Sequence, residues 1–153
     1  DGPVAPPTFG ASGDLAEQIR GGAPFDVFLS ADLTLPKALE GEGHVEAGSV
    51  VPYARGSLVL LVHPDVPAGS VSQAFLHVEE GNADAALVSR SLVAGAKSKV
   101  VEVDPALYPP RIQGLGITAK SPNKARAREF IDFLLRGGGR RVLAGHGFAP
   151  PHP

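Results

Sequence analysis

Short apolar runs alternate along the chain with segments whose apolar residues recur every three to four positions. The apolar runs are predicted strands, over 26–30, 57–63, 84–88, 99–103 and 111–118. The segments with helical spacing are predicted helices, over 12–19, 33–41, 71–80, 123–136 and, briefly, 140–144. Residues 4–9 are expected to be extended. Strands that alternate with helices indicate an α/β fold with a mostly parallel sheet flanked by helices.

Two of the predicted helices have clear signals in the sequence. Ser12 precedes Leu15 and Ile19, which lie four residues apart, so we expect Ser12 to cap a helix that Gly21 and Gly22 end. The helix over 123–136 is amphipathic. Its apolar stripe consists of Ala127, Phe130, Ile131, Leu134 and Leu135.

Composition narrows the classes of function. The chain has 153 residues, of which 43% are hydrophobic, and a formal net charge of −2. That charge argues against nucleic acid or an anionic membrane as the partner. The chain has no cysteine, which excludes disulfides and thiolate metal sites. It has no methionine and begins with Asp1, so it is expected to be processed or incomplete; a removed secretory signal peptide is one cause and a missing fragment is another.

The stretch Phe9-Gly10-Ala11-Ser12-Gly13-Asp14 is the strongest candidate for binding chemistry. A strand there runs into a glycine-flanked turn that opens a helix, whose first N–H groups have no internal partner and favour negative charge. Glycines let an anion approach the backbone, and the Ser12 hydroxyl adds a donor. A plain helix cap is the commoner interpretation of such spacing. The predicted helix start at Ser70-Val71 has the same two interpretations, an anion site or a plain helix cap.

Catalytic and metal chemistry are weakly supported by the sequence. The turn lacks the final glycine of a G-x-S-x-G nucleophile elbow, because Asp14 stands there. The five histidines show no metal-binding spacing, and no phosphate-binding P-loop motif is present. We therefore predict no enzymatic activity, no metal site and no cofactor.

Five stretches, in this order, resemble the periplasmic molybdate-binding proteins of ABC importers. They are FGASGDLAEQIRGGAPFDVFLSAD (9–32), YARGSLVLLVHP (53–64), SVSQAFLHVEEGNADAALVSRSL (70–92), YPPRIQGLGITAKSPN (108–123) and REFIDFLLRGGGRRVLAGHGFAPP (128–151). The resemblance implies a two-lobed fold of the type II periplasmic-binding-protein class. It also implies an oxyanion held in the crevice by hydroxyl and backbone N–H groups, without a metal cofactor.

The resemblance assigns candidate ligand-binding residues. Ser12 matches a binding serine of the family, and Val71 matches a residue whose backbone N–H contacts the anion from the other lobe. Ala68 lies in a turn, 66–69, that resembles a ligand-contacting V-P-A-G turn. Where some members bind with a tyrosine hydroxyl, this chain has Ser89.

Two departures from the family concern the organisation of the chain. The family's first strand and its binding serine are missing before Asp1, and most of the second lobe is missing between Pro64 and Ser70. We expect residues 1–64 to form a first-lobe segment, 65–88 a reduced second-lobe or crossing segment, and 89–153 a return to the first lobe with C-terminal helices. With these losses we expect weakened binding and an exposed strand edge.

The resemblance implies a periplasmic protein, a monomer when complete, that captures molybdate or tungstate and delivers it to the membrane permease of an ABC importer.

Two other interpretations stay open at this point. One is a one-lobe scaffold that no longer binds a ligand. The other is the effector-sensing domain of a transcription regulator, which shares this topology, although the sequence contains no helix-turn-helix segment.

Overall fold

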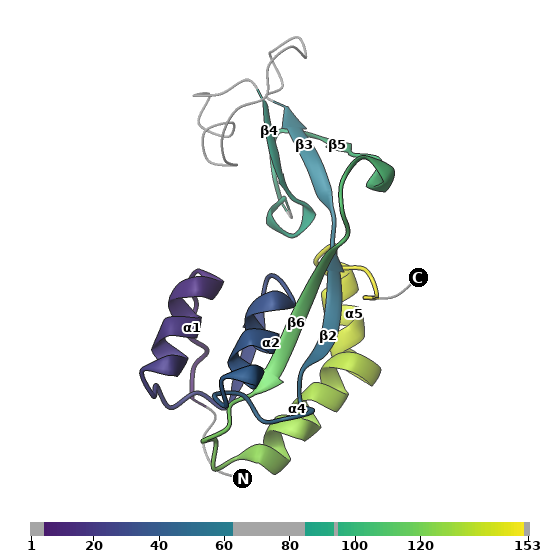
Figure 1. Cartoon of the computed structure of the whole chain (residues 1–153). Helices are drawn as coiled ribbons and strands as arrows, with labels where there is room; N and C mark the ends of the chain where they lie inside the picture. The colour runs from purple at the N-terminus through teal and green to yellow at the C-terminus, as the bar shows by residue number, and fades with distance from the viewer. Residues whose placement is uncertain (1–4, 63–84, 94, 152–153) are drawn as a thin grey trace. The chain divides into compact units, whose positions relative to one another are not determined.

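The computed structural model describes residues 5–62, 85–93 and 95–151. Two short 3₁₀ helices, η1 (Arg90–Leu92) and η2 (Pro105–Leu107), lie among the longer elements (Figure 1). The α-helices are α1 (Ser12–Arg20), α2 (Thr34–Gly41), α4 (Lys124–Arg136) and α5 (Gly138–Gly145). The strands are β1 (Val27–Ser30), β2 (Val51–Gly56), β3 (Leu58–Val62), β4 (Ala85–Ser89), β5 (Lys99–Glu102) and β6 (Arg111–Ile117).

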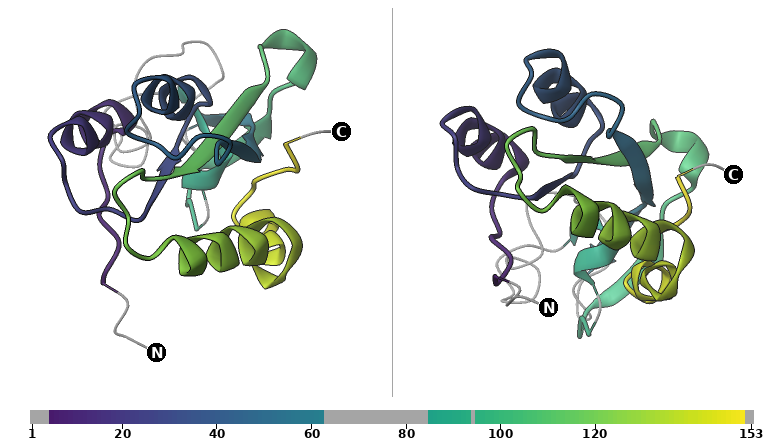
Figure 2. Two further views of the ribbon diagram at one scale, coloured as in Figure 1. Left: turned by 60° about the horizontal axis from the view of Figure 1, so that its bottom comes forward. Right: turned by 90° about the horizontal axis from the view of Figure 1, so that it is seen from below.

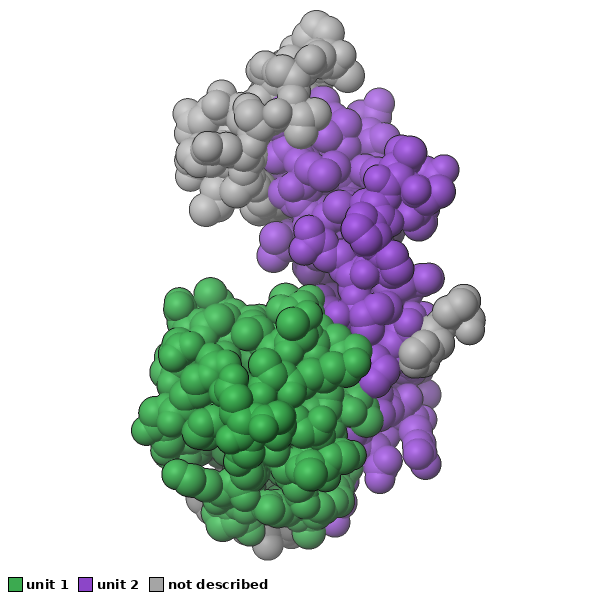
Figure 3. Space-filling model, in the orientation of Figure 1, with its two compact units in different colours: residues 1–51, 114–128 green, residues 52–113, 129–153 purple. Residues whose placement is uncertain are grey.

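The chain divides into two compact units, coloured separately in Figure 3. Unit 1 comprises residues 1–51 and 114–128, and unit 2 comprises residues 52–113 and 129–153. The chain passes from one unit to the other within β2, within β6 and within α4. The predicted division at residues 64 and 88 stays a prediction, because most of the middle segment lies outside the described residues.

Unit 1 is built on the pairing of β1 with β6, and Figure 2 shows α1 and α2 together on one face of this pair. The spacing of Ala16 and Ile19 on α1 directs both side chains inward, where they cluster with Phe28 of β1 and Leu39 of α2. Ala16 and Leu39 are fully buried. This cluster fixes the start of α1 beside the end of β1.

Unit 2 contains the three-stranded sheet β4-β3-β5. Alternate residues of the strands, Val59 and Leu61 on β3 and Ala86 and Val88 on β4, form its buried cluster.

The predicted mostly parallel sheet is wrong. The strand pairings described in both sheets are antiparallel, β1 with β6 in one and β3 with β4 and β5 in the other. The sequence β1-α2-β2 does resemble a strand-helix-strand unit of a parallel sheet. However, the strand order β1-β6-β2 inserts β6, from much later in the chain, between the two. Local alternation of strands and helices therefore did not determine the pairing.

Most other elements lie close to their predicted positions, with two exceptions. The strand β2 was not predicted, because Pro52 and Arg55 interrupt the apolar pattern; β2 lies at the sheet edge, where proline is tolerated. On α4, Ala127 and Leu134 are buried as expected, whereas Phe130 is 41% exposed. The predicted helix over 71–80 lies outside the described residues.

Candidate functional site

Ser12 is the first residue of α1 and not its cap. Ala11 occupies the N-cap position with an extended backbone (φ −62°, ψ 139°), and no side chain caps the helix. The prediction that the Ser12 hydroxyl caps the helix is therefore wrong. The first turn begins with the Leu15 N–H donating to the Ala11 carbonyl at 3.0 Å, and the N–H groups of the three preceding residues have no intrahelical acceptor. Both the helix dipole and these donors favour an anion at this end of α1.

The Ser12 hydroxyl oxygen accepts a hydrogen bond from the Ala31 backbone N–H, at 3.1 Å. Ala31 directly follows β1, so this bond ties the start of α1 to the end of the strand. A serine hydroxyl has one hydrogen to donate besides its acceptor sites. Since the Ser12 oxygen accepts from the Ala31 N–H, the hydroxyl hydrogen is not used in this bond and can be donated to another acceptor. The geometry thus leaves the Ser12 hydroxyl hydrogen available to donate.

The start of α2 lies at the same end of β1, but its donors are already used. The Asp32 carboxylate accepts hydrogen bonds from the backbone N–H groups of Thr34, at 2.7 Å, and Leu35, at 2.9 Å. Ser30 is 1% exposed, and its hydroxyl accepts from the Asp32 N–H at 3.3 Å. The carboxylate therefore neutralises this helix start. Of these two helix starts, that of α1 is the candidate for an anion in unit 1.

Two glycines shape the surroundings of these turns. A side chain at Gly13, in the first turn of α1, would meet no atom within 4 Å, so space is open beside the helix start. At Gly114 of β6 a Cβ atom would lie 2.5 Å from Leu33 Cδ1 and 3.0 Å from Leu33 Cα. Gly114 therefore lets the residue before α2 pack directly on the sheet, and its N–H donates to the Asp32 carbonyl at 3.2 Å.

Of the other predicted site residues, only Ser89 lies among the residues that the structure describes. Val71 and Ala68 lie outside the described residues, so their roles stay predictions. Ser89 is at the end of β4 in unit 2, where its hydroxyl lies 2.9 Å from the Ser91 hydroxyl.

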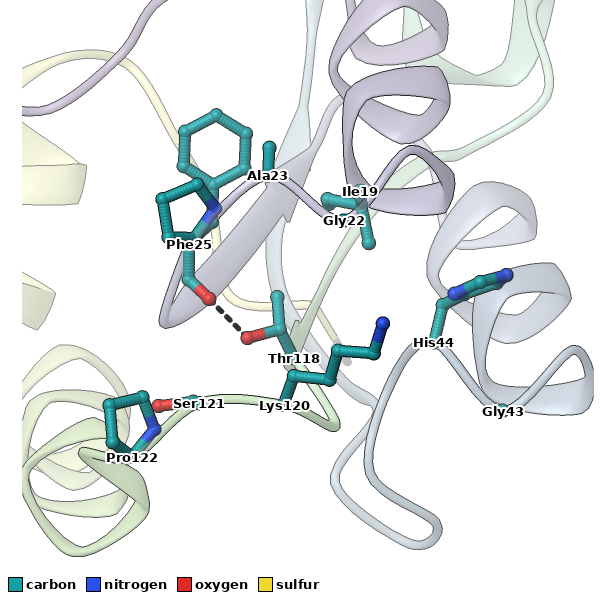
Figure 4. Close-up of a pocket in the computed structure, with 11 residues that line it drawn as sticks. Ile19, Gly22, Ala23, Phe25, Gly43, His44, Thr118, Lys120, Ser121 and Pro122 are labelled. Carbon is teal, nitrogen blue, oxygen red and sulfur yellow. Dashed lines mark hydrogen bonds between the residues drawn. The ribbon is translucent and has the colours of Figure 1, made fainter.

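A small cavity of about 150 Å³ lies in unit 1 at the opposite end of β1 (Figure 4). It is formed by three turns: the one between α1 and β1, the one after α2, and the one between β6 and α4. Thr118 donates to the Phe25 carbonyl on its wall, and Figure 4 shows the Lys120 chain extending between Thr118 and His44. No pattern in the sequence signals this cavity, because its residues come from three distant segments.

Ion pairing near this cavity stabilises the ends of α1 and α2. The Arg20 guanidinium contacts both carboxylate oxygens of Glu42 at 2.7 Å and also contacts Glu17. The hydrogen bond from Arg20 lowers the pKa of Glu42 below its ordinary value, and the bond from Glu42 raises the pKa of Arg20. In unit 2, burial raises the pKa of Tyr53 to about 12, and its hydroxyl donates to Gln113 Oε1 at 2.5 Å.

Among residues 5–62, 85–93 and 95–151, no group of three or more His, Cys, Asp or Glu side chains is arranged to hold a metal ion. No helix in these ranges is long and apolar enough to cross a membrane.

The chain matches a family of binding proteins over most of its length. The sequence model for the family "Bacterial extracellular solute-binding protein" matches residues 6–76 and 66–149. The molybdate-binding protein ModA of Azotobacter vinelandii is 40% identical over 109 residues, which cover 62% of this chain and 43% of that protein. ModA of Rhodobacter capsulatus is 28% identical over 191 residues, covering 92% of this chain and 75% of that protein.

Solved structures show the same fold. The substrate-binding domain of a putative molybdenum ABC transporter from Clostridium difficile has a TM-score of 0.75 and 25% identity, covering 94% of this chain and 84% of that one. The periplasmic molybdate-binding protein of A. vinelandii has a TM-score of 0.78 and 24% identity, covering 94% and 86%. Iron-bound HitA from Pseudomonas aeruginosa, at 18% identity and a TM-score of 0.67, is similar in fold alone.

The alignment with the R. capsulatus protein also shows an internal difference in length. It spans 191 positions, whereas 92% of this chain's 153 residues is about 141, so about 50 positions have no counterpart here. The family model likewise matches in two pieces that overlap at residues 66–76. The two pieces meet between β3 and β4, which indicates that the relatives have additional chain in that connection.

Proposed function

The chain belongs to the family of bacterial extracellular solute-binding proteins, and from that premise we propose that it captures molybdate, or tungstate, for an ABC importer. The proposed site in unit 1 is the start of α1, where the Ser12 hydroxyl and the first backbone N–H groups donate to the oxyanion. The proposed contacts from the rest of the chain are the Val71 backbone N–H and, more weakly, Ala68. The proposed location is the periplasm, and the proposed protein partner is the membrane permease.

The family is one of binding proteins and not of enzymes, which confirms the prediction that this chain has no enzymatic activity. The ModA proteins to which it is homologous are named for molybdate binding. That name supports the choice of ligand but belongs to the relatives.

The observation on which the proposal rests is the hydrogen bond from the Ala31 N–H to the Ser12 hydroxyl oxygen. It supports a donor role for Ser12, because it leaves the hydroxyl hydrogen available at a helix start that has no side-chain cap. A site made of donors satisfies a fully deprotonated tetrahedral oxyanion such as molybdate, tungstate or sulfate. Hydrogen phosphate also carries a proton that needs an acceptor, and an unpaired donor in a closed site is costly.

The carboxylates near the proposed site are poorly placed to accept a hydrogen bond from such a proton. Asp14 follows Ser12 on α1, but its side chain is exposed. The Asp32 carboxylate already accepts two backbone hydrogen bonds. We therefore expect molybdate and tungstate to bind in preference to hydrogen phosphate.

A competition experiment tests this selectivity. The melting temperature of the protein is measured with molybdate, tungstate, sulfate or phosphate at equal ionic strength, since a ligand that binds the folded state raises it. We expect the largest increase with molybdate or tungstate and none with phosphate. An equal or larger increase with phosphate would contradict a site made of donors.

The shortened β3–β4 connection favours a second candidate, a scaffold that no longer binds an oxyanion. It predicts no change of melting temperature with any of the four anions. The same experiment therefore separates the two candidates.

A further inference from the structure

The strand β4 forms one edge of the sheet β4-β3-β5 in unit 2. Its register places Leu87 opposite Leu60 of β3, and Leu60 opposite Val101 of β5. Residues directly opposite one another lie on the same face, so these three side chains form an apolar row across the sheet. Leu87 is 49% exposed and Val101 is 38% exposed. Among the residues that the structure describes, no strand pairs with the outer edge of β4.

The comparisons bear on the outer edge of β4. The two pieces of the family match meet at residues 66–76, in the connection between β3 and β4, which indicates that the additional chain of the relatives falls there. In the alignment with the R. capsulatus protein this chain lacks about 50 positions, since the 191 positions contain 92% of its 153 residues. Chain that could cover or extend this side of the sheet in the relatives is therefore reduced here.

The two edges of the sheet differ in how they are protected against pairing. Charged residues begin and end β5, Lys99 and Glu102, and Arg90 forms an ion pair with Glu102. Charges on an edge strand discourage association with another strand. The residues of β4 are Ala-Ala-Leu-Val-Ser, without a charge or a proline. Of the two edges, that of β4 is the one suited to accept another strand.

We propose that β4 pairs with β4 of a second copy of this chain, antiparallel and about a two-fold axis. Such an axis is perpendicular to the sheet and keeps each side chain on its face, so only positions of the same face can oppose each other. Centring the pair on Leu87 meets this condition: Leu87 opposes Leu87 of the second copy, and Ala85 opposes Ser89. The apolar row Leu87-Leu60-Val101 then continues directly into the same row of the second copy.

Cysteine cross-linking tests the register, because the chain contains no cysteine. Opposed residues of antiparallel strands have Cα atoms about 4.5–5.5 Å apart, within the range of about 4.4–6.8 Å that a disulfide spans. We expect Leu87→Cys to form a covalent dimer under mild oxidation, and Val101→Cys on the other edge to remain monomeric. Cross-linking of Val101→Cys in place of Leu87→Cys would overturn the assignment to β4.

Sedimentation velocity tests the dimer itself. The wild-type chain should dimerise as its concentration rises. Leu87→Lys should stay monomeric, because it places two like charges opposite each other at the axis. Leu107→Lys, at a leucine that is 77% exposed, is the matched control and should dimerise like the wild type. A wild-type chain that is monomeric at every concentration, with its circular dichroism spectrum intact, would overturn the proposal. None of these measurements depends on oxyanion binding.

Discussion

Replacing Ser12 with alanine separates a structural role from a binding role. The hydroxyl accepts one hydrogen bond, from the Ala31 N–H at 3.1 Å, and it caps no helix. Ala31 is exposed, so water can satisfy its N–H in the variant. The cost to folding should then lie at the low end for a lost hydrogen bond, about 0.5 kcal/mol. Loss of a hydrogen bond to a charged ligand costs more, about 1.5–3 kcal/mol, which is a roughly 10- to 150-fold rise in the dissociation constant.

Thr34→Ala is the matched control for this variant. Thr34 is the first residue of α2, as Ser12 is of α1, and it is exposed, but the Asp32 carboxylate already accepts from the first N–H groups of its helix. Urea unfolding gives the change in stability, and isothermal titration with sodium molybdate gives the dissociation constant. We expect a small loss of stability for both variants and a loss of affinity for Ser12→Ala alone. A Ser12→Ala variant that binds within about two-fold of the wild type would refute the role assigned to this hydroxyl.

Two further predictions concern the stability of unit 1. Gly114→Ala should destabilise the fold by about 1–3 kcal/mol in urea unfolding, because the new Cβ would lie 2.5 Å from Leu33 Cδ1. The control Gly41→Ala has open space around the new Cβ and should be neutral or slightly stabilising. Equal effects of the two substitutions would contradict the close packing at Gly114. The ion pair with Arg20 lowers the pKa of Glu42 in the folded protein below its ordinary value of 4.5. The pair therefore contributes to folding stability above pH 4.5, and this contribution is lost as the pH falls through the lowered pKa. The melting temperature of Glu42→Gln should therefore fall less below pH 4.5 than that of the wild type, and parallel pH profiles would count against the pair.

The positions of the helices could be predicted from the sequence, because their signals are local. The spacing of Leu15 and Ile19 and the glycines that follow were sufficient to place α1. The relative direction of the paired strands, by contrast, depends on residues far apart in the sequence. The neighbour of β1 is β6, and the pairing of Val27 with Ile117 joins residues 90 positions apart. A strand-helix-strand pattern contains no information about a third strand inserted between its two strands.

In the candidate site, too, local features could be predicted from the sequence and contacts between distant segments could not. The turn at Ser12 could be found from its residue types, but the partner of its hydroxyl could not. Ala31 contributes only a backbone N–H, which no residue type signals. Its position follows from the packing of α1 on β1 and α2, through Ala16, Phe28 and Leu39. The cap was predicted one residue too late for the same reason, since the extended backbone at Ala11 follows from how the chain enters the helix.

Isothermal titration of sodium molybdate into the wild-type chain tests the central claim most directly. The proposal predicts saturable heat with one oxyanion bound per chain, and displacement by tungstate but not by phosphate. Heat that does not saturate, or heat that phosphate abolishes as well as tungstate does, would contradict an oxyanion site of donors at the start of α1.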